Sequence, residues 1–150
     1  MKKSVTILLS ALLLTAAGIL FFSCKQGKTD STQSSPECEA LANIALKAMQ
    51  EQDYDTYVGL SNTPANKKQD LVQMLRNKYS QINAATGGIE SYQILGSEID
   101  PTNSTKCTVH TSVHYKGGTS DNPDPFDAPW DMPFENVDSQ WYLVCEVSSN

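Results

Sequence analysis

Apolar and polar residues change their spacing along the chain. From Val5 to Phe22 the residues are almost continuously apolar, and from Lys25 to Pro36 there is no Leu, Ile, Val, Met or aromatic residue. Between Cys38 and Ile82 apolar residues recur every three or four positions, the period of an amphipathic helix. From Glu90 onward they alternate with polar residues, the period of a half-buried strand. This order predicts helices first and strands second.

Three helices are predicted. The first begins at Pro36 and ends near Gln52, and its apolar stripe holds Cys38, Leu41, Ala45, Ala48 and Met49, widened by Ile44. Asp53 is placed to cap a short second helix that ends at Leu60. The third follows "SNTPAN" and ends at Gly87-Gly88, because glycine readily adopts the positive φ of a helix C-cap. Its apolar side is expected to carry Leu71, Met74, Leu75, Tyr79 and Ile82.

Four strands are predicted from "ESYQILGSEI", "KCTVHTSVHY", "PWDMPFENV" and "SQWYLVCEV". Pro133 indicates an edge or bulged position for the third strand. The inward residues are expected to be Cys107, Val109, Thr111, Val113, Tyr115, Trp141, Leu143, Cys145 and Val147. The predicted fold class is therefore α+β, with three N-terminal helices packed on a curved antiparallel sheet of about four strands.

Two segments resemble a known superfamily. "KAMQEQDYDTYVGLS" and "VDSQWYLVCEV" are similar to parts of the nuclear-transport-factor-two-like (NTF2-like, cystatin-like cone) domains, small lipid-anchored members of which have no known function. The resemblance implies one cone domain over residues 37–150. In enzymes of this fold an inward Asp, His or Tyr acts as acid or base, and no carboxylate is among the expected inward residues.

The segment before Cys24 predicts export. Lys2 and Lys3 precede the apolar run, which is the arrangement of a signal peptide. Ser23-Cys24 resembles the lipobox of bacterial lipoproteins, although Phe21 stands where an aliphatic residue is usual. The resemblance implies cleavage after residue 23 and lipidation of Cys24, with an uncleaved anchor or plain secretion as alternatives. Residues 24–36 are then the lipidated cysteine and a disordered tether.

The charge balance restricts the partners. The chain has 11 Lys and Arg against 17 Asp and Glu, and removal of residues 1–23 takes two lysines, which leaves a net charge of −8. Such a surface repels nucleic acid and anionic lipid headgroups. We therefore expect no nucleic-acid partner and contact with the membrane through the lipid anchor alone. The expected location is the cell envelope, as an outer-membrane lipoprotein on either its periplasmic or its surface face.

The two histidines give no metal site by spacing. His110 and His114 share a strand face, but their Cα atoms lie about 13 Å apart, too far to hold one zinc ion. No acid is visibly placed to orient either ring. Asp121, Asp124 and Asp127 lie in a loop without the spacing of a calcium loop, and a solvated loop is expected. No metal or cofactor is predicted.

Several aromatic residues are candidates to line a pocket. Tyr54, Tyr57, Tyr79, Tyr115 and Trp141 could surround a space between helices and sheet, and plain core filling is the alternative. Trp130 would indicate a partner or glycan site if it were exposed.

Three cysteines remain after Cys24. In an oxidising compartment we expect one disulfide, Cys38 with Cys107 or Cys145, and one spare thiol. Cys107 and Cys145 are expected at opposite ends of the sheet, beyond bridging distance. The alternative is that all three are reduced core residues.

Two functions follow. The first is a lipid-anchored envelope protein with a non-catalytic role, which binds a small apolar ligand or an envelope protein. The alternative is a cone-fold isomerase or dehydratase-like enzyme with a single acid or base in an apolar pocket.

Overall fold

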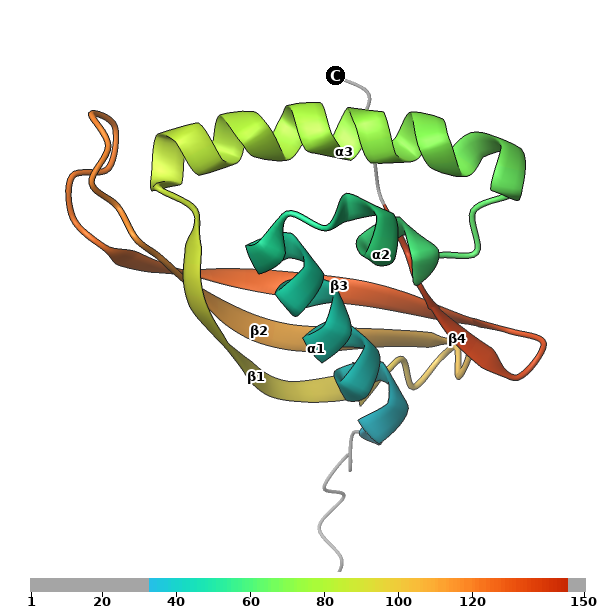
Figure 1. Cartoon of the computed structure of the whole chain (residues 1–150). Helices are drawn as coiled ribbons and strands as arrows, with labels where there is room; N and C mark the ends of the chain where they lie inside the picture. Colours follow the sequence, from blue (N-terminus) through green and yellow to red (C-terminus); the bar gives the residue numbers. More distant parts are fainter. Residues whose placement is uncertain (1–32, 146–150) are drawn as a thin grey trace, which may run out of the picture. The chain divides into compact units, whose positions relative to one another are not determined.

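The computed structural model describes residues 33–145 (Figure 1). The signal segment, Cys24 and Val147 lie outside this range. The helices are α1 (Pro36–Glu51), α2 (Tyr54–Gly59) and α3 (Ala65–Thr86), and the strands are β1 (Ile89–Ile99), β2 (Lys106–Tyr115), β3 (Phe126–Val137) and β4 (Gln140–Leu143). The strands form one antiparallel sheet in the order β1-β2-β3-β4. The predicted α+β class and element order are confirmed. In the part of the chain described, no helix is long and apolar enough to cross a membrane.

Local sequence sets the helix ends. The Ser35 side chain accepts a hydrogen bond from the Cys38 amide at the start of α1, and Asp53 accepts one from the Thr56 amide at the start of α2. These bonds satisfy amide groups that have no partner inside the helix. Gly87 ends α3 with φ 76°, the left-handed conformation predicted for it.

The buried faces of two helices differ from the predicted ones. In α1, Ala42 and Leu46 are fully buried, whereas Ile44 is 44% exposed. In α3, Val72 is buried, whereas Met74 is 45% exposed. The other predicted residues of both stripes are buried or partly buried, so the differences lie at the margins of the two faces. The 3.6-residue period leaves these margins open when apolar residues stand on both sides of the stripe.

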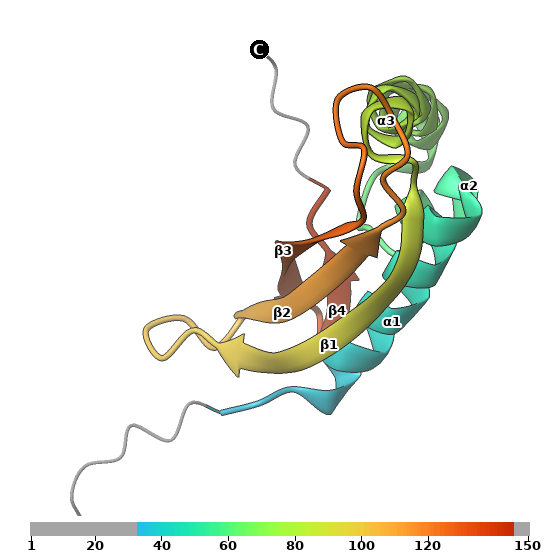
Figure 2. The same cartoon turned by 90° about the vertical axis from the view of Figure 1, so that its left-hand side faces the viewer.

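The helices lie on one side of the sheet. Figure 2 shows α1 against one face of β1 and β2, while none of the three described helices covers the opposite face. The core lies between them, and the largest fully buried side chains are Phe134, Leu46, Met132, Leu143 and Val58. On β2, alternate residues from Cys107 to Val113 are buried as predicted, and those between them are at least partly exposed. The inner face is therefore apolar and the outer face polar.

The two prolines of β3 lie at and beyond the point where its pairing with β4 ends. Among the described strands, β4 pairs with β3 only from Phe134 to Val137. The carbonyl of Pro133 accepts a hydrogen bond from Val144. The backbone N–H and C=O positions of odd-numbered residues in β3 therefore point away from β2. Pro129 has the same parity. Their missing N–H groups therefore cost no bond to β2. The edge or bulged position predicted for Pro133 holds only in part, because Pro133 lies opposite Val144 where β4 ends.

The domain begins before residue 37. Ile99 donates its amide to the Gln33 carbonyl at 2.9 Å, and the Ser35 amide donates to Ser97 Oγ at 2.8 Å. Residues 33–35, predicted as tether, thus lie along the free edge of β1. Satisfying these backbone groups explains why a segment without apolar residues is placed here.

Candidate functional site

The predicted pocket residues come together on the inner face. Tyr54 and Tyr57 are buried, and Tyr79, Tyr115 and Trp141 are partly buried against the same core. The ring centroids of Tyr54 and Tyr79 lie 6.2 Å apart, and those of Tyr79 and Trp130 lie 5.9 Å apart. Trp130 is therefore packed in the cluster rather than exposed. Stacked rings at these separations fill the space between α2, α3 and the sheet.

The ionisable groups of this cluster stay neutral near pH 7. Burial raises the pKa of Tyr79 to about 12, and burial also raises the pKa of Tyr57. The only buried polar side chain on the strands of the inner face is Thr111, whose hydroxyl donates to the Trp130 carbonyl at 2.6 Å. These groups can donate hydrogen bonds, but none carries a charge that would make it a general base.

The three described cysteines are free thiols, and no bond joins any two of them. Cys38 and Cys107 are both buried, and they lie close enough for each thiol to affect the pKa of the other. Burial raises the pKa of Cys107 to about 12 and also raises the pKa of Cys38. Both groups are therefore thiols rather than nucleophilic thiolates.

Cys145 lies apart from this pair, but not for the predicted reason. Cys107 pairs with Phe134, which in turn pairs with Leu143, so Cys107 and the end of β4 share one end of the sheet. The prediction of opposite ends was wrong because β4 has only four residues and pairs with the last part of β3. Cys107 on β2 and the end of β4 are still two strand spacings apart, about 9.6 Å, because β3 lies between them. Bridging needs Cα atoms less than about 7 Å apart.

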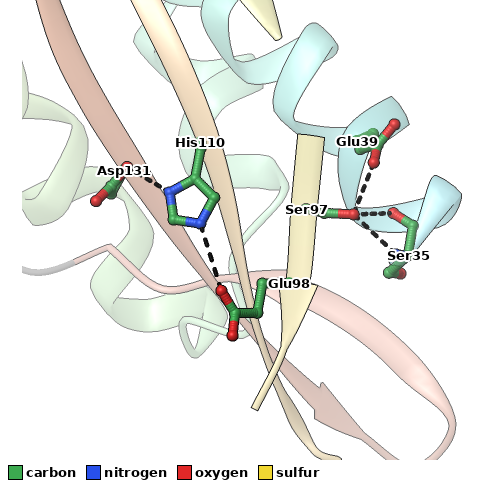
Figure 3. A network of polar contacts seen from close by, with 6 residues as sticks. All are labelled: Ser35, Glu39, Ser97, Glu98, His110 and Asp131. Atoms are coloured by element: carbon green, nitrogen blue, oxygen red, sulfur yellow. Dashed lines mark hydrogen bonds and ion pairs between the residues drawn. The ribbon is translucent and has the colours of Figure 1, made fainter. Parts of the chain in front are cut away.

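The outer face carries two similar rows of charged side chains. His110 on β2 lies between Asp131 on β3 and Glu98 on β1 (Figure 3). His114, four residues further along β2, lies between Asp127 and Glu90 in the same way. Each histidine thus has a carboxylate on both sides of its ring. The prediction that no acid orients the histidines was wrong.

The distances within the two rows are unequal. Nδ1 of His110 lies 2.8 Å from Asp131 Oδ1, and Nε2 lies 3.9 Å from Glu98 Oε2. Nδ1 of His114 lies 2.9 Å from Asp127 Oδ1, and Nε2 lies 3.3 Å from Glu90 Oε2. The side chains of His110 and His114 are 43% and 35% exposed. Solvent and ions therefore reach both rings.

Two bulges in β1 place the glutamates. The β1–β2 register shifts between Ile89 and Ser91 and again between Ile94 and Gly96, next to the partners of His114 and His110. Glu90 is the unpaired residue of the first shift. At the second, Gly96 lies opposite His110, and the absence of a side chain there leaves room for Glu98 to reach the ring. Bulges re-aim side chains in this way and are frequent beside functional sites.

Shallow depressions follow the same face. One of about 510 Å³ is bordered by Glu98, Asp100, Lys106, His110 and Glu135 among others. Another of about 610 Å³ is bordered by Ser91, Tyr92, Gln93, Ser112, His114 and Asp127. Each depression thus includes one of the two histidines. The outer face is the most organised polar surface of the described domain.

The acidic loop is more ordered than predicted. Thr119 and Asn122 both donate hydrogen bonds to the Ala85 carbonyl in the last turn of α3. Asp121 and Asp124 are exposed, whereas Asp127 belongs to β3 and contacts His114. The loop therefore caps α3 through its uncharged residues.

Comparison with known proteins supports the fold. No family model matches the chain, and no curated protein matches it in sequence. Among solved structures, it is similar to a protein assigned as an NTF2-like transpeptidase from Campylobacter jejuni, with a TM-score of 0.50 and 12% identity over 73% of this chain and 98% of that one. It is also similar to RPA3114, a SEC-C motif containing protein from Rhodopseudomonas palustris, with a TM-score of 0.51 and 15% identity over 74% of this chain and 77% of that one. The chain has an NTF2-like fold.

Proposed function

We propose that this chain is a lipid-anchored cell-envelope protein whose NTF2-like domain has a non-catalytic binding or accessory role. The observation that carries the proposal is the contrast between the two faces of the sheet. The inner face is packed with aliphatic, aromatic and thiol groups, and the outer face presents exposed charged rows. An exposed surface with charged side chains, such as the outer face, suits recognition of a partner.

The alternative cone-fold enzyme is less well supported. Such an enzyme needs an acid or base that is directed into an apolar pocket and titrates near the working pH. The tyrosines and cysteines of the described inner face have raised pKa values. The transpeptidase activity assigned to the Campylobacter jejuni protein is not carried over, because a thiol with a raised pKa is a poor nucleophile.

The binding partner that we favour is an envelope protein. The stacked aromatic cluster leaves less room for a small apolar ligand than an open cone would, whereas the outer face is accessible. Lipidation of Cys24 would hold the domain in the outer membrane, facing either the periplasm or the exterior.

Two experiments test this proposal. Labelled palmitate should be incorporated into the full chain and not into Cys24→Ser, and equal labelling of both would end the lipidation claim. The lipidated chain, cross-linked in intact envelopes and purified, should retain a specific protein that is lost when the outer face is altered by Asp131→Asn with Asp127→Asn. Mass spectrometry of proteins and small molecules should be run on both samples. Retention of an apolar small molecule alone would replace the protein partner with a ligand.

A further inference from the structure

For a neutral ring, the distances in each row favour one position of the proton, whereas a protonated ring would donate to both carboxylates. A neutral imidazole has one N–H and one acceptor nitrogen. In both rows Nδ1 is the nitrogen at hydrogen-bond distance from an aspartate, 2.8 Å for His110 and 2.9 Å for His114. The proton therefore belongs on Nδ1. The lone pair of Nε2 then faces a glutamate oxygen, and two acceptors with nothing between them repel each other.

A cation between Nε2 and the glutamate would turn this contact into an attractive one. We propose that the outer face holds two divalent-metal sites of the zinc class, His114 with Glu90 and His110 with Glu98. In each site Nε2 and one glutamate oxygen are the protein ligands. Asp127 and Asp131 are positioning residues that hold the rings by the Nδ1–H bond. A carboxylate on the second nitrogen is the usual outer partner of a metal-bound histidine.

The ligand separations rank the two sites. Two ligands of a tetrahedral zinc ion, with bonds of about 2.0–2.1 Å, lie roughly 3.3 Å apart. Nε2 of His114 and Oε2 of Glu90 are 3.3 Å apart, which matches this value. The corresponding atoms of His110 and Glu98 are 3.9 Å apart, so the exposed Glu98 side chain must move slightly. The His114 site is therefore the tighter one.

The sites are open rather than closed. In the described residues no group of three or more His, Cys, Asp and Glu side chains is arranged to hold one ion. Each site has two protein ligands, and water completes the coordination. The field around them favours a cation, because on the described strands five acidic residues share this face with one lysine, Lys106. The acidic residues are Glu90, Glu98, Asp127, Asp131 and Glu135. The imidazole ligand favours zinc-class ions over Mg²⁺ and Ca²⁺.

The local fold shows that the geometry is built into the strands. Asp127 and Asp131 are the direct cross-strand partners of His114 and His110 on β3. On β1, where regular pairing would not place a glutamate beside either ring, each of the two bulges brings one there. The Asp–His–Glu row thus occurs twice, with the two histidines four residues apart on β2, and a bulge in β1 accompanies each row.

Titration of the full chain with ZnCl₂ in detergent, followed by calorimetry at neutral pH, tests the sites. We expect saturable binding of up to two ions per chain. His114→Asn should abolish the tighter event, and Asp127→Asn, which leaves both ligands in place, should weaken it by about tenfold. MgCl₂ should give no comparable binding.

A control removes carboxylate charge elsewhere, and more of it than Asp127→Asn does. Asp121→Asn with Asp124→Asn, in the exposed β2–β3 loop, should change Zn²⁺ binding less than about twofold, since loss of general attraction is a weak effect. No binding to the folded chain, equal binding of Mg²⁺, or binding unaffected by His114→Asn and His110→Asn would overturn the proposal. Binding lost only when the thiols are blocked would also overturn it. Thermal melting without metal shows that each variant is folded.

Discussion

Cys38 and Cys107 face each other across the contact between α1 and β2. Both side chains are almost completely buried, and they lie close enough for each thiol to affect the pKa of the other. One disulfide was expected from the sequence, with Cys107 or Cys145 as the partner of Cys38, and only Cys107 lies close to Cys38. Cys145 instead lies beside Ser61, with which its thiol can hydrogen bond.

We predict that oxidation links Cys38 to Cys107. The bond would close a loop of roughly 70 residues, for which chain-entropy arguments give a stabilisation of about 4 kcal/mol relative to the reduced chain. Peptide mapping by mass spectrometry after mild oxidation should find this pair, and denaturant unfolding should measure the gain.

Cys145→Ser is the control and should leave both results unchanged. Cys38→Ser should abolish the gain. A map in which Cys145 is bonded to either residue would contradict the prediction.

At the scale of elements, Gly87 joins α3 to the sheet. Its φ of 76° is the left-handed conformation that side chains disfavour, and an added Cβ would collide with the Gly117 carbonyl. Gly117 in turn donates its amide to the Thr86 carbonyl. The end of α3 and the start of the β2–β3 loop therefore touch backbone to backbone.

Gly87→Ala should destabilise the domain by about 1–3 kcal/mol, because strain and a steric clash act together. Gly59→Ala in α2 is the matched variant, since a Cβ there would meet nothing within 4 Å. It should be neutral or stabilising by up to about 1 kcal/mol, the helix-propensity difference. Urea unfolding of the two variants compares them, and equal losses would refute the account of Gly87.

The element order could be read from the sequence, and the pairing of the charged side chains could not. Pro36, Asp53 and Gly87 mark helix ends through local bonds, so their signals are visible in a single chain. His110 and Asp131 are 21 residues apart, and their contact depends on strand register. The two β1 bulges then decide which side chains face the histidines, and Gly96 was the only local sign of one.

The inner cluster was predicted better than the outer rows because burial follows from local sequence pattern, whereas the outer contacts depend on strand register. Tyr54 and Tyr57 are buried and Tyr79 is partly buried, and all three lie on the side of α2 and α3 that packs against the core. The shortness of β4 could not be foreseen, because the alternation of Trp141, Leu143 and Cys145 continues past its end. Hydrophobic pattern shows which face is buried but does not show where backbone pairing stops.

For the molecule as a whole, the free edge of β3 is a risk of self-association. Unpaired backbone groups along an edge can pair with another chain. Pro129 removes an N–H group from the unpaired part of this edge, and Pro133 removes one at its boundary, beside Val144. They therefore limit edge-to-edge pairing without weakening the sheet.

Replacing both prolines by threonine should increase self-association severalfold, because two donors are restored on a strand edge. Size-exclusion chromatography with light scattering, at matched concentrations, measures the effect. Pro101→Thr with Pro123→Thr, at two exposed turn positions, removes the same residue types and should remain at the wild-type level. If both double variants associate equally, the edge is not the cause.

The chain joins the folded domain at Gln33, beside Ile99 and the turn between β1 and β2. If Cys24 is lipidated as proposed, residues 24–32 can extend about 30 Å at most, and the domain is suspended from this end of the sheet. His110 then lies nearer the suspension point, and His114 lies about 13 Å further along β2. An ion or partner that approaches from the side away from the membrane would meet the His114 site first.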